Sequence, residues 1–575
     1  FHKTTVGLSF TLRSSRFQIH SWCRTPQGEG KSDGCLVERV WNAVQNISKR
    51  HQFKFILLLR IFLAISYNCY FVAAVYHART ERLDIDWCDG VGMLIILTVI
   101  VYCGLFYYKI FKPLWGDCAY TRVILPLTIF LERCWSYRYV RVLLILGGAI
   151  GFIVGIIFDT EGDRDRLYSL IGLAIFLLFG WIFSKHKAKI KWTQVIWGTV
   201  LQFLFGLTVL RWDTGQKVFA CMGDRVSIFL KYTDAGSGLV YGHLVTDQNE
   251  SGIPLGTIFA FKALSVIFLF SFMVSILYYY GVMQFIVQKV GWLLQVSLGT
   301  TATESINCAA NIFLGQTEAP LAIKPLLPLL TKSELHAVMT SGFATISGSV
   351  LSAYISFGIN ASHLLSASVM SAPAALAFAK LFYPESEESQ TKAEDIKVPK
   401  GKEANVLDAA SQGASNAVFM VINICANLIA FLAFIAFLNG IISWMGGLLG
   451  APYITFEYLV GKCFIPLAWV MGVPAKECDQ IGHVVALKTI VNEFVAYRKL
   501  SEYMAQGLVS KRSETIATYA LCGFSNPGSI GIQIAALGSM APSRQTDLAQ
   551  VAFRAFISGS IACFMTACVA GKYSK

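Results

Sequence analysis

Gln316, Thr317 and Glu318 stand side by side inside a long apolar segment, 300–330, where polar side chains could contact a ligand. Gly315 precedes them and a proline follows two residues after the glutamate, and both residue types disfavour a continuous helix. A break in a membrane helix frees backbone carbonyls, which must find partners where there is no water. A cation or a polar substrate could be that partner.

The carboxylate of Glu318 is expensive to bury, which favours a functional interpretation. A charged side chain at membrane depth costs roughly 2.5–3.5 kcal/mol even on the mild insertion scale. Residues kept at that cost usually belong to a substrate or ion pathway. The alternative is structural, with Glu318 near the membrane surface or paired with Lys324.

Glu493 stands directly after Asn492 in a second apolar segment, 484–504, and could act at a second break. The structural alternative is stronger here, because two basic residues and a glutamate follow closely and could place it near a membrane edge. Its position in an internal repeat, described below, favours the functional interpretation.

The segment 522–529 contains two glycines and a proline, which predict an unwound turn in an apolar helix. Such a turn would expose the side chains of Asn526 and Ser529 together with several carbonyls. Phe524 beside them could stack on a ring or close it off, although a lone phenylalanine is most often part of a core.

Side-chain oxygens of Asn311 and Thr345, with nearby carbonyls, would suit sodium, a hard cation that takes oxygen ligands. A lone Asn or Thr in a membrane helix usually makes a hydrogen bond between helices. Only the combination indicates an ion site.

Two stretches of the C-terminal half resemble each other. Lys-Ser-Glu at 332–334 precedes Gly-Phe at 342–343, and Arg-Ser-Glu at 512–514 precedes Gly-Phe at 523–524. Each follows one of the interrupted, glutamate-bearing segments, and the comparison places Thr345 and Ile346 at the turn that corresponds to 522–529. An odd number of predicted crossings separates the copies, so they should be inverted, as in secondary transporters with a binding site at the midplane. The alternative is chance similarity of apolar sequence.

The composition indicates an integral membrane protein. Of 575 residues, 55% are hydrophobic and only 14% are charged, whereas a soluble protein carries roughly a quarter. The net charge of +13 is spread over the ends of apolar segments, so nucleic acid is not an expected partner. The predicted spans are 53–76, 91–111, 140–158, 167–184, 192–210, 253–280, 335–357, 363–382, 417–438 and 550–570, with a broken one at 515–538.

Basic and acidic connections alternate along the first spans, which places the N-terminus in the cytoplasm. By the same count 213–252 lies outside and 383–415 is a solvated loop inside. The amphipathic stretch 218–232 is too charged to span and should lie along the interface.

Four motifs in order resemble the concentrative nucleoside transporter family. They are GQTEAP at 315–320, AYISFG at 353–358, VNEFVAY at 491–497 and CGFSN at 522–526, within a likeness that covers about residues 167–570. The resemblance implies an all-α membrane protein with about 11 transmembrane helices, two re-entrant hairpins, and scaffold and transport domains in a homotrimer. It implies sodium-coupled uptake of nucleosides by an elevator-type movement at the plasma membrane, with no cofactor other than the coupling ion.

The resemblance also implies roles for individual residues. The nucleobase would contact Gln316, Thr317 and Glu318, and the ribose would contact Glu493, Asn526 and Ser529, with Phe524 lining the site. Sodium would be held by Asn311 and Thr345 side chains and the carbonyls of Leu314 and Ile346. Gly315, Ser349, Val350 and Cys522 resemble the broad-specificity vertebrate type, which takes purines and pyrimidines and can also use protons. The family's usual Asn-Leu-Ser-Ser is Asn-Pro-Gly-Ser at 526–529 here, so Pro527 should stiffen the turn of the ribose site.

The corresponding domain division has seven parts. They are a cytoplasmic tail 1–50, three additional N-terminal helices 51–160, scaffold helices with an interfacial helix 161–280, a first hairpin repeat 281–382, a cytoplasmic loop 383–415, a scaffold helix with an interfacial segment 416–480, and a second hairpin repeat with the last helix 481–575.

Three other functions stay open on the sequence. A secondary transporter for another polar solute would share every feature above. A channel or receptor that binds its ligand without moving it needs no pair of inverted gates. A membrane enzyme with Glu318 and Glu493 as an acid–base pair would need a nucleophile or metal ligands, and no such motif stands out, so we do not expect an enzyme.

Overall fold

The computed structural model describes residues 36–81, 86–137, 139, 147, 151, 154, 166–245, 258–391 and 403–573. These residues form helices and connections without a strand, which confirms the predicted all-α class. The chain divides into two compact units, 1–151 and 152–575, which are described separately. The predicted tail 1–50 and the predicted span 140–158 lie largely outside the described residues.

The first unit contains two long helices that match the first two predicted spans. α2 covers Leu36–Thr80 and α3 covers Gly90–Phe106. Two hydrogen bonds join them, from the Asn68 amide to the Tyr102 hydroxyl and between the Tyr67 and Thr98 hydroxyls. The chain continues through η1 (Tyr107–Phe111), α4 (Lys112–Ala119), η2 (Tyr120–Ile124) and α5 (Leu125–Ser136).

The second unit opens with a series of helices before the predicted repeats. They are α7 (Arg166–Ile182), α8 (Trp192–Leu210), α9 (Asp213–Lys231), α10 (Thr233–Tyr241), α11 (Phe259–Lys262) and α12 (Val266–Tyr280). The amphipathic stretch predicted at 218–232 lies almost wholly within α9, which is a single helix.

The stretch predicted as the first repeat forms a helical hairpin followed by a broken helix. Its parts are α13 (Val282–Leu298), α14 (Ala302–Asn311), the 3-10 helix η5 (Ala319–Leu329), α15 (Lys332–Ala344), α16 (Gly348–Ser356) and α17 (Ala361–Phe382). The prediction of one continuous span at 335–357 is wrong, because the helix stops at Ala344 and restarts at Gly348.

The break lies where the tip of the hairpin approaches. The Gly348 amide donates to the Phe313 carbonyl at 3.3 Å. A Cβ atom on Gly348 would come within 2.9 Å of that oxygen, so the approach requires a glycine. Ser347 then caps the new helix by accepting from the Ser349 amide.

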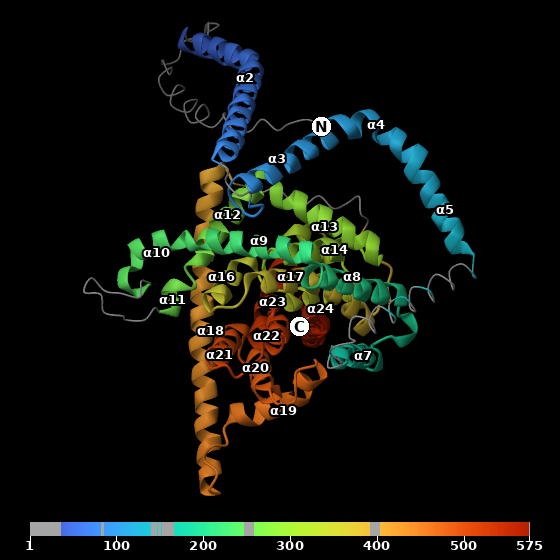
Figure 1. Cartoon of the computed structure of the whole chain (residues 1–575), viewed down its shortest axis with the longest axis vertical. Coiled ribbons are helices and arrows are strands. Elements are labelled where there is room, and N and C mark those ends of the chain that lie inside the picture. Colours follow the sequence, from blue (N-terminus) through green and yellow to red (C-terminus); the bar gives the residue numbers. More distant parts are fainter. Residues whose placement is uncertain are drawn as a thin grey trace, which may run out of the picture. The chain divides into compact units, whose positions relative to one another are not determined.

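The second repeat follows a long helix, α18 (Val406–Leu448), and α19 (Phe456–Val470). It consists of α20 (Cys478–Ile490), α21 (Glu493–Ala505), α22 (Lys511–Leu521), α23 (Pro527–Met540) and the last helix α24 (Gln545–Tyr573). The predicted break within 515–538 is confirmed between α22 and α23. α18 extends well beyond the predicted span 417–438 at both ends and runs along one side of the second unit (Figure 1).

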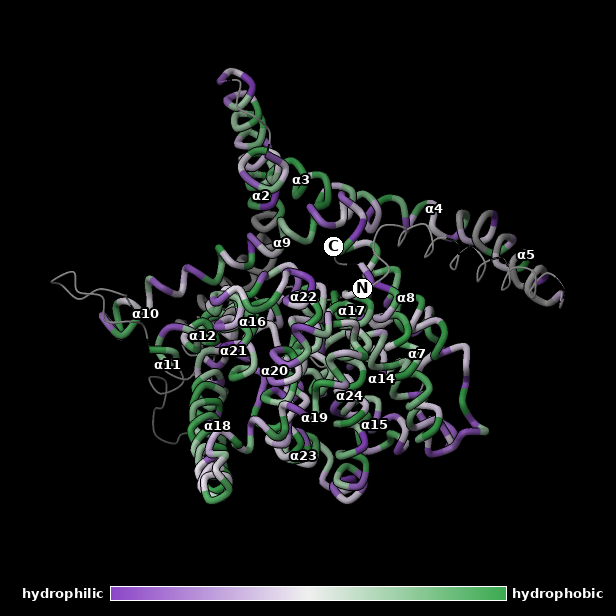
Figure 2. The backbone as a smooth tube through the Cα atoms, turned by 60° about the horizontal axis from the view of Figure 1, so that its bottom comes forward, coloured by the Kyte–Doolittle hydropathy of each residue, from purple (hydrophilic) through white to green (hydrophobic). Residues whose placement is uncertain are grey.

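Seven of the described helices are long and apolar enough to cross a membrane. Figure 2 shows hydrophobic residues along much of α18. Its most apolar stretch is only 6% buried within this chain, so most of that surface must face lipid or another membrane helix.

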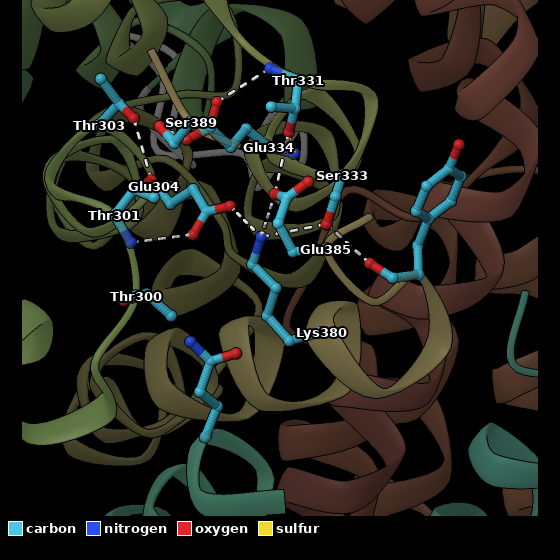
Figure 3. Close-up of polar contacts among 12 residues, drawn as sticks. Thr300, Thr301, Thr303, Glu304, Thr331, Ser333, Glu334, Lys380, Glu385 and Ser389 are labelled. Atoms are coloured by element: carbon cyan, nitrogen blue, oxygen red, sulfur yellow. Dashed lines mark hydrogen bonds and ion pairs between the residues drawn. The ribbon is translucent and has the colours of Figure 1, made fainter. Parts of the chain in front are cut away.

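A buried charge cluster holds the base of the first hairpin (Figure 3). Glu304 and Glu334 complete capping boxes at the starts of α14 and α15. Lys380 forms an ion pair with Glu304 and a longer one, 3.4 Å, with Glu385. Ser389 donates to Glu334 at 2.6 Å. The first part of the predicted solvated loop 383–415 is therefore packed against the hairpin.

Candidate functional site

The two broken helices meet at their breaks. The Phe524 amide, between α22 and α23, donates to the Thr345 carbonyl, between α15 and α16, at 3.3 Å. A Cβ atom on Gly523 would lie 2.7 Å from the Phe343 carbonyl oxygen and 2.5 Å from the Cys563 sulfur. The glycine therefore permits the contact between the repeats, and the two polar turns belong to one site.

The second break is built around Glu493 and Asn526. Their side chains are joined by a hydrogen bond from the Asn526 amide to the carboxylate at 2.9 Å, and the Tyr354 hydroxyl donates to the other carboxylate oxygen at 3.5 Å. Asn526 also caps α23 by accepting from the Ser529 amide at 2.9 Å. Pro527 is the first residue of α23, where its missing N–H and fixed φ fit a helix start. The proline thus preserves the turn.

Glu318 lies at the tip of the first hairpin, after the end of α14. One of its carboxylate oxygens accepts from the Gly315 amide at 3.3 Å. Lys324 is exposed on η5, and among the described residues no ion pair joins it to Glu318.

A cavity of about 420 Å³ connects these turns. Its wall includes nine of the residues singled out in the sequence, namely Gly315, Gln316, Thr317, Glu318, Val350, Glu493, Phe524, Asn526 and Ser529. The volume lies in the range of small-molecule sites. Two carboxylates, two amides and two hydroxyls thus converge with an aromatic ring in one concave site.

Two residues predicted beside the site do not line this cavity. Cys522 is fully buried, with its sulfur 3.9 Å from the Ser368 hydroxyl. Ser349 is also buried and contacts the Ser347 hydroxyl at 2.6 Å and the Met420 sulfur at 3.7 Å. Any effect of Cys522 and Ser349 on a ligand must therefore act through the residues that line the cavity.

One wall of the cavity comes from α18, which the sequence reasoning did not connect with the site. Asn416, Met420, Asn423, Asn427 and Phe431 line it at helical spacing. Three asparagines on one face of an otherwise apolar helix are a signal that could have been read from the sequence. Ser347, Asn492 and Phe494 also line the cavity and were not predicted.

Asn311 and Thr345 both form hydrogen bonds with Ser341. The Asn311 amide donates to the Ser341 hydroxyl at 3.1 Å, and the Thr345 hydroxyl donates to the Ser341 carbonyl at 2.8 Å. The Asn311 side-chain oxygen is buried and has no hydrogen-bond partner among the described residues. Leu314 and Ile346 are also buried. A buried acceptor without a donor fits a bare cation.

Three family models match the second unit. They are the Na+ dependent nucleoside transporter N-terminus at residues 171–244, Nucleoside recognition (Gate) at 260–361, and the Na+ dependent nucleoside transporter C-terminus at 363–571. Their boundaries fall close to the ends of the helices described above.

Two curated relatives match most of the chain at the same level. Solute carrier family 28 member 3 of Eptatretus stoutii is 42% identical over 95% of this chain and 79% of its own length. Sodium/nucleoside cotransporter 1 of Oryctolagus cuniculus is 42% identical over 91% of this chain and 78% of its own length.

Solved structures of CNTnw share the fold. One in an inward-facing substrate-bound state matches with a TM-score of 0.67 at 37% identity, over 71% of this chain and 98% of that one. A variant in an outward-facing state matches with a TM-score of 0.69 at 37% identity, over 72% of this chain and 99% of that one. On this evidence the chain belongs to the sodium-dependent, or concentrative, nucleoside transporter family.

Proposed function

We propose that this protein carries purine and pyrimidine nucleosides into the cell together with sodium, by an elevator-type movement. Membership of the family makes it a sodium-coupled nucleoside transporter with alternating access and not an enzyme. The main support for this proposal is that Glu318 of the first hairpin and Glu493 of the second line the same cavity.

The chemistry of the cavity matches a sugar-linked base. Ribose hydroxyls can donate to the Glu493 carboxylate and accept from Asn526 and Ser529, which lie together at the second break. Gln316, Thr317 and Glu318 supply the donors and acceptors that a nucleobase edge requires. Phe524 forms an aromatic wall next to the ribose side.

We assign sodium to the end of α14. Asn311 offers a buried oxygen to which no described residue donates, and Asn311 and Thr345 both hydrogen-bond to Ser341. The carbonyls of Leu314 and Ile346 complete the proposed ligand set. Coupling requires that sodium and nucleoside raise each other's affinity by the same factor, because linkage between binding sites is reciprocal.

The membrane potential makes such coupling effective. One positive charge moving through 100 mV gains roughly 2.3 kcal/mol. At about 1.4 kcal/mol per tenfold, this supports about a 50-fold nucleoside gradient. The sodium gradient adds to it.

In the proposed movement the two hairpins and the broken helices travel as a transport domain past a scaffold that includes α12 and α18, which pack on each other. The exposed apolar surface of α18 suits contacts with lipid or with the other subunits of a homotrimer.

We place the protein in the plasma membrane with a cytoplasmic N-terminus. Gly315, Ser349, Val350 and Cys522 are assigned to substrate range and to the use of protons besides sodium.

Uptake of radiolabelled uridine and adenosine by oocytes that express the chain tests the proposal. Both should enter against their gradients in sodium medium and lose that uptake when choline replaces sodium. Uptake that ignores sodium, or absence of uptake of both compounds by protein at the cell surface, would exclude it.

A further inference from the structure

Lys488 is a fully buried lysine in the last turn of α20, the first helix of the second hairpin. Its ammonium donates to the Ala520 carbonyl at 2.9 Å and lies 5.6 Å from the centre of the Phe564 ring. Fully buried lysines are rare unless they are paired. The mechanism proposed above does not use this cation.

The ammonium lies where two helices end. α20 ends at Ile490 and α22 ends at Leu521, and the two helices pack on each other. The C-terminal end of a helix carries roughly half a negative charge on its free carbonyls. Two such ends, meeting away from water, need a positive charge between them, and Lys488 provides one.

The first repeat has the same arrangement without a lysine. α14 ends at Asn311 and packs on α15, which ends at Ala344. The amide of Asn307 donates to the Val338 carbonyl and to the Ser341 hydroxyl, so the two helices are joined near their ends.

Of the four helices α14, α15, α20 and α22, only α20 has a basic residue in its last turn. In the first repeat, the side-chain oxygens of Asn307 and Asn311 are instead buried without a donor among the described residues. One pair of helix ends thus has unfilled acceptors, and the other pair has a tethered cation.

We propose that Lys488 is a built-in cation, whose ammonium holds in the second repeat the place that sodium takes in the first. This inference rests on the proposed sodium site at Asn311. The second repeat is then not a sodium site, since its position is permanently filled. Lys488 is a positioning residue: it fixes the end of α22 at Ala520, four residues before Phe524 and six before Asn526.

The two halves of the cavity differ as a result. The half with Glu493 and Asn526 has its cation at all times, bound to the end of α22. The half with Gln316 and Glu318 depends on an ion that comes and goes. Sodium should therefore control contacts with the base more than contacts with the ribose.

Two substitutions separate a cation from a packing role. Lys488→Met keeps the length of the side chain but has no charge and no oxygen. Lys488→Asn introduces the residue type that Asn311 provides in the first repeat, so free sodium can replace the ammonium. Lys476→Met, at an exposed lysine before the same hairpin, is the matched control.

Uridine uptake and uridine-evoked current are measured together in oocytes over a range of sodium concentrations. Lys488→Met should raise the uridine KM at saturating sodium by about tenfold or more, which corresponds to about 1.4 kcal/mol, with an unchanged Hill coefficient for sodium. Lys488→Asn should recover uptake at high sodium, with a larger Hill coefficient and about one more charge moved per uridine. Lys476→Met should match the unmodified protein.

The proposal fails if Lys488→Met has the original uridine KM, or if Lys488→Asn shows no steeper sodium dependence than Lys488→Met. Surface biotinylation identifies variants that do not reach the membrane. For these, melting of the purified protein is compared in sodium and in choline. Lys488→Asn should gain more stability from sodium than the unmodified chain, and no extra gain overturns the proposal.

Asn311→Ala separates this inference from the proposed function. If that variant keeps its sodium dependence, the sodium site of the first repeat is misplaced, whatever the Lys488 variants show. If it loses sodium dependence while the Lys488 variants behave like Lys476→Met, only the built-in cation is rejected.

Discussion

The side-chain amide of Asn526 lies 2.9 Å from the carboxylate of Glu493, and this hydrogen bond joins the second hairpin to the second broken helix. Both side chains are almost fully buried, yet both line the cavity. A ligand that enters finds the two groups already oriented by each other. Such preorganisation reduces the cost of ordering side chains on binding.

Glu493→Gln should lower uridine uptake by at least about tenfold while the protein still reaches the cell surface. A hydrogen bond to a charged group contributes about 1.5–3 kcal/mol, and about 1.4 kcal/mol is tenfold. Glu502→Gln, at a partly exposed glutamate of the same helix, should transport normally. Normal transport by Glu493→Gln would mean that the binding site lies elsewhere.

Gly523→Ala should reduce the amount of folded protein at the surface. The added methyl group would overlap the Phe343 carbonyl and the Cys563 sulfur, and overpacking of this kind costs about 1–3 kcal/mol. Gly531→Ala is the control, because a Cβ atom there meets no atom of the described residues within 4 Å. Equal surface abundance and equal melting temperatures for the two variants would show that the breaks do not pack as described.

Asn423→Leu should raise the uridine KM by about 2- to 12-fold without loss of surface protein. It removes a polar group from the α18 wall of the cavity, and one neutral hydrogen bond contributes about 0.5–1.5 kcal/mol. Ile422→Leu changes the neighbouring residue, which does not line the cavity, and should have no effect. A KM for Asn423→Leu equal to that of the control would remove α18 from the binding site.

Glu304→Gln and Lys380→Met should each destabilise the protein more than their combination does. Removing one partner of a buried ion pair costs about 3–5 kcal/mol, because the other charge stays buried alone. The melting temperatures of the purified single and double variants test this. Lys332→Met, which breaks a partly exposed pair with Asp547, should change little because water screens it. Additive effects of the two buried substitutions would show that Glu304 and Lys380 do not depend on each other.

The sequence predicted the breaks where glycine and proline mark them. Gly315 and Pro320 marked the tip of the first hairpin, and Pro527 marked the start of α23. The apolar run 335–357 did not reveal the break between α15 and α16. The residues at this break include no proline and are mostly apolar or small. Only the repeat comparison placed a turn at Thr345, and the structure confirms that turn.

The polar residues of the site could be predicted where they stand next to a break in an apolar helix. The α18 wall was missed, although Asn416, Asn423 and Asn427 recur at helical spacing, because a lone asparagine in a membrane helix usually bonds to a neighbouring helix. Lys488 and Lys380 were not identified either, since their partners, Ala520 and Glu304, are far away in sequence. Contacts of that range depend on how the helices pack.

The hydrogen bond between the Phe524 amide and the Thr345 carbonyl joins the turn assigned to sodium with the turn assigned to the sugar. Each cargo should therefore order backbone that the other needs. A half-loaded carrier would keep one disordered turn in the dry interior, which disfavours its crossing. We expect this link to limit slippage, so that the cell does not dissipate its sodium gradient without taking up nutrient in return.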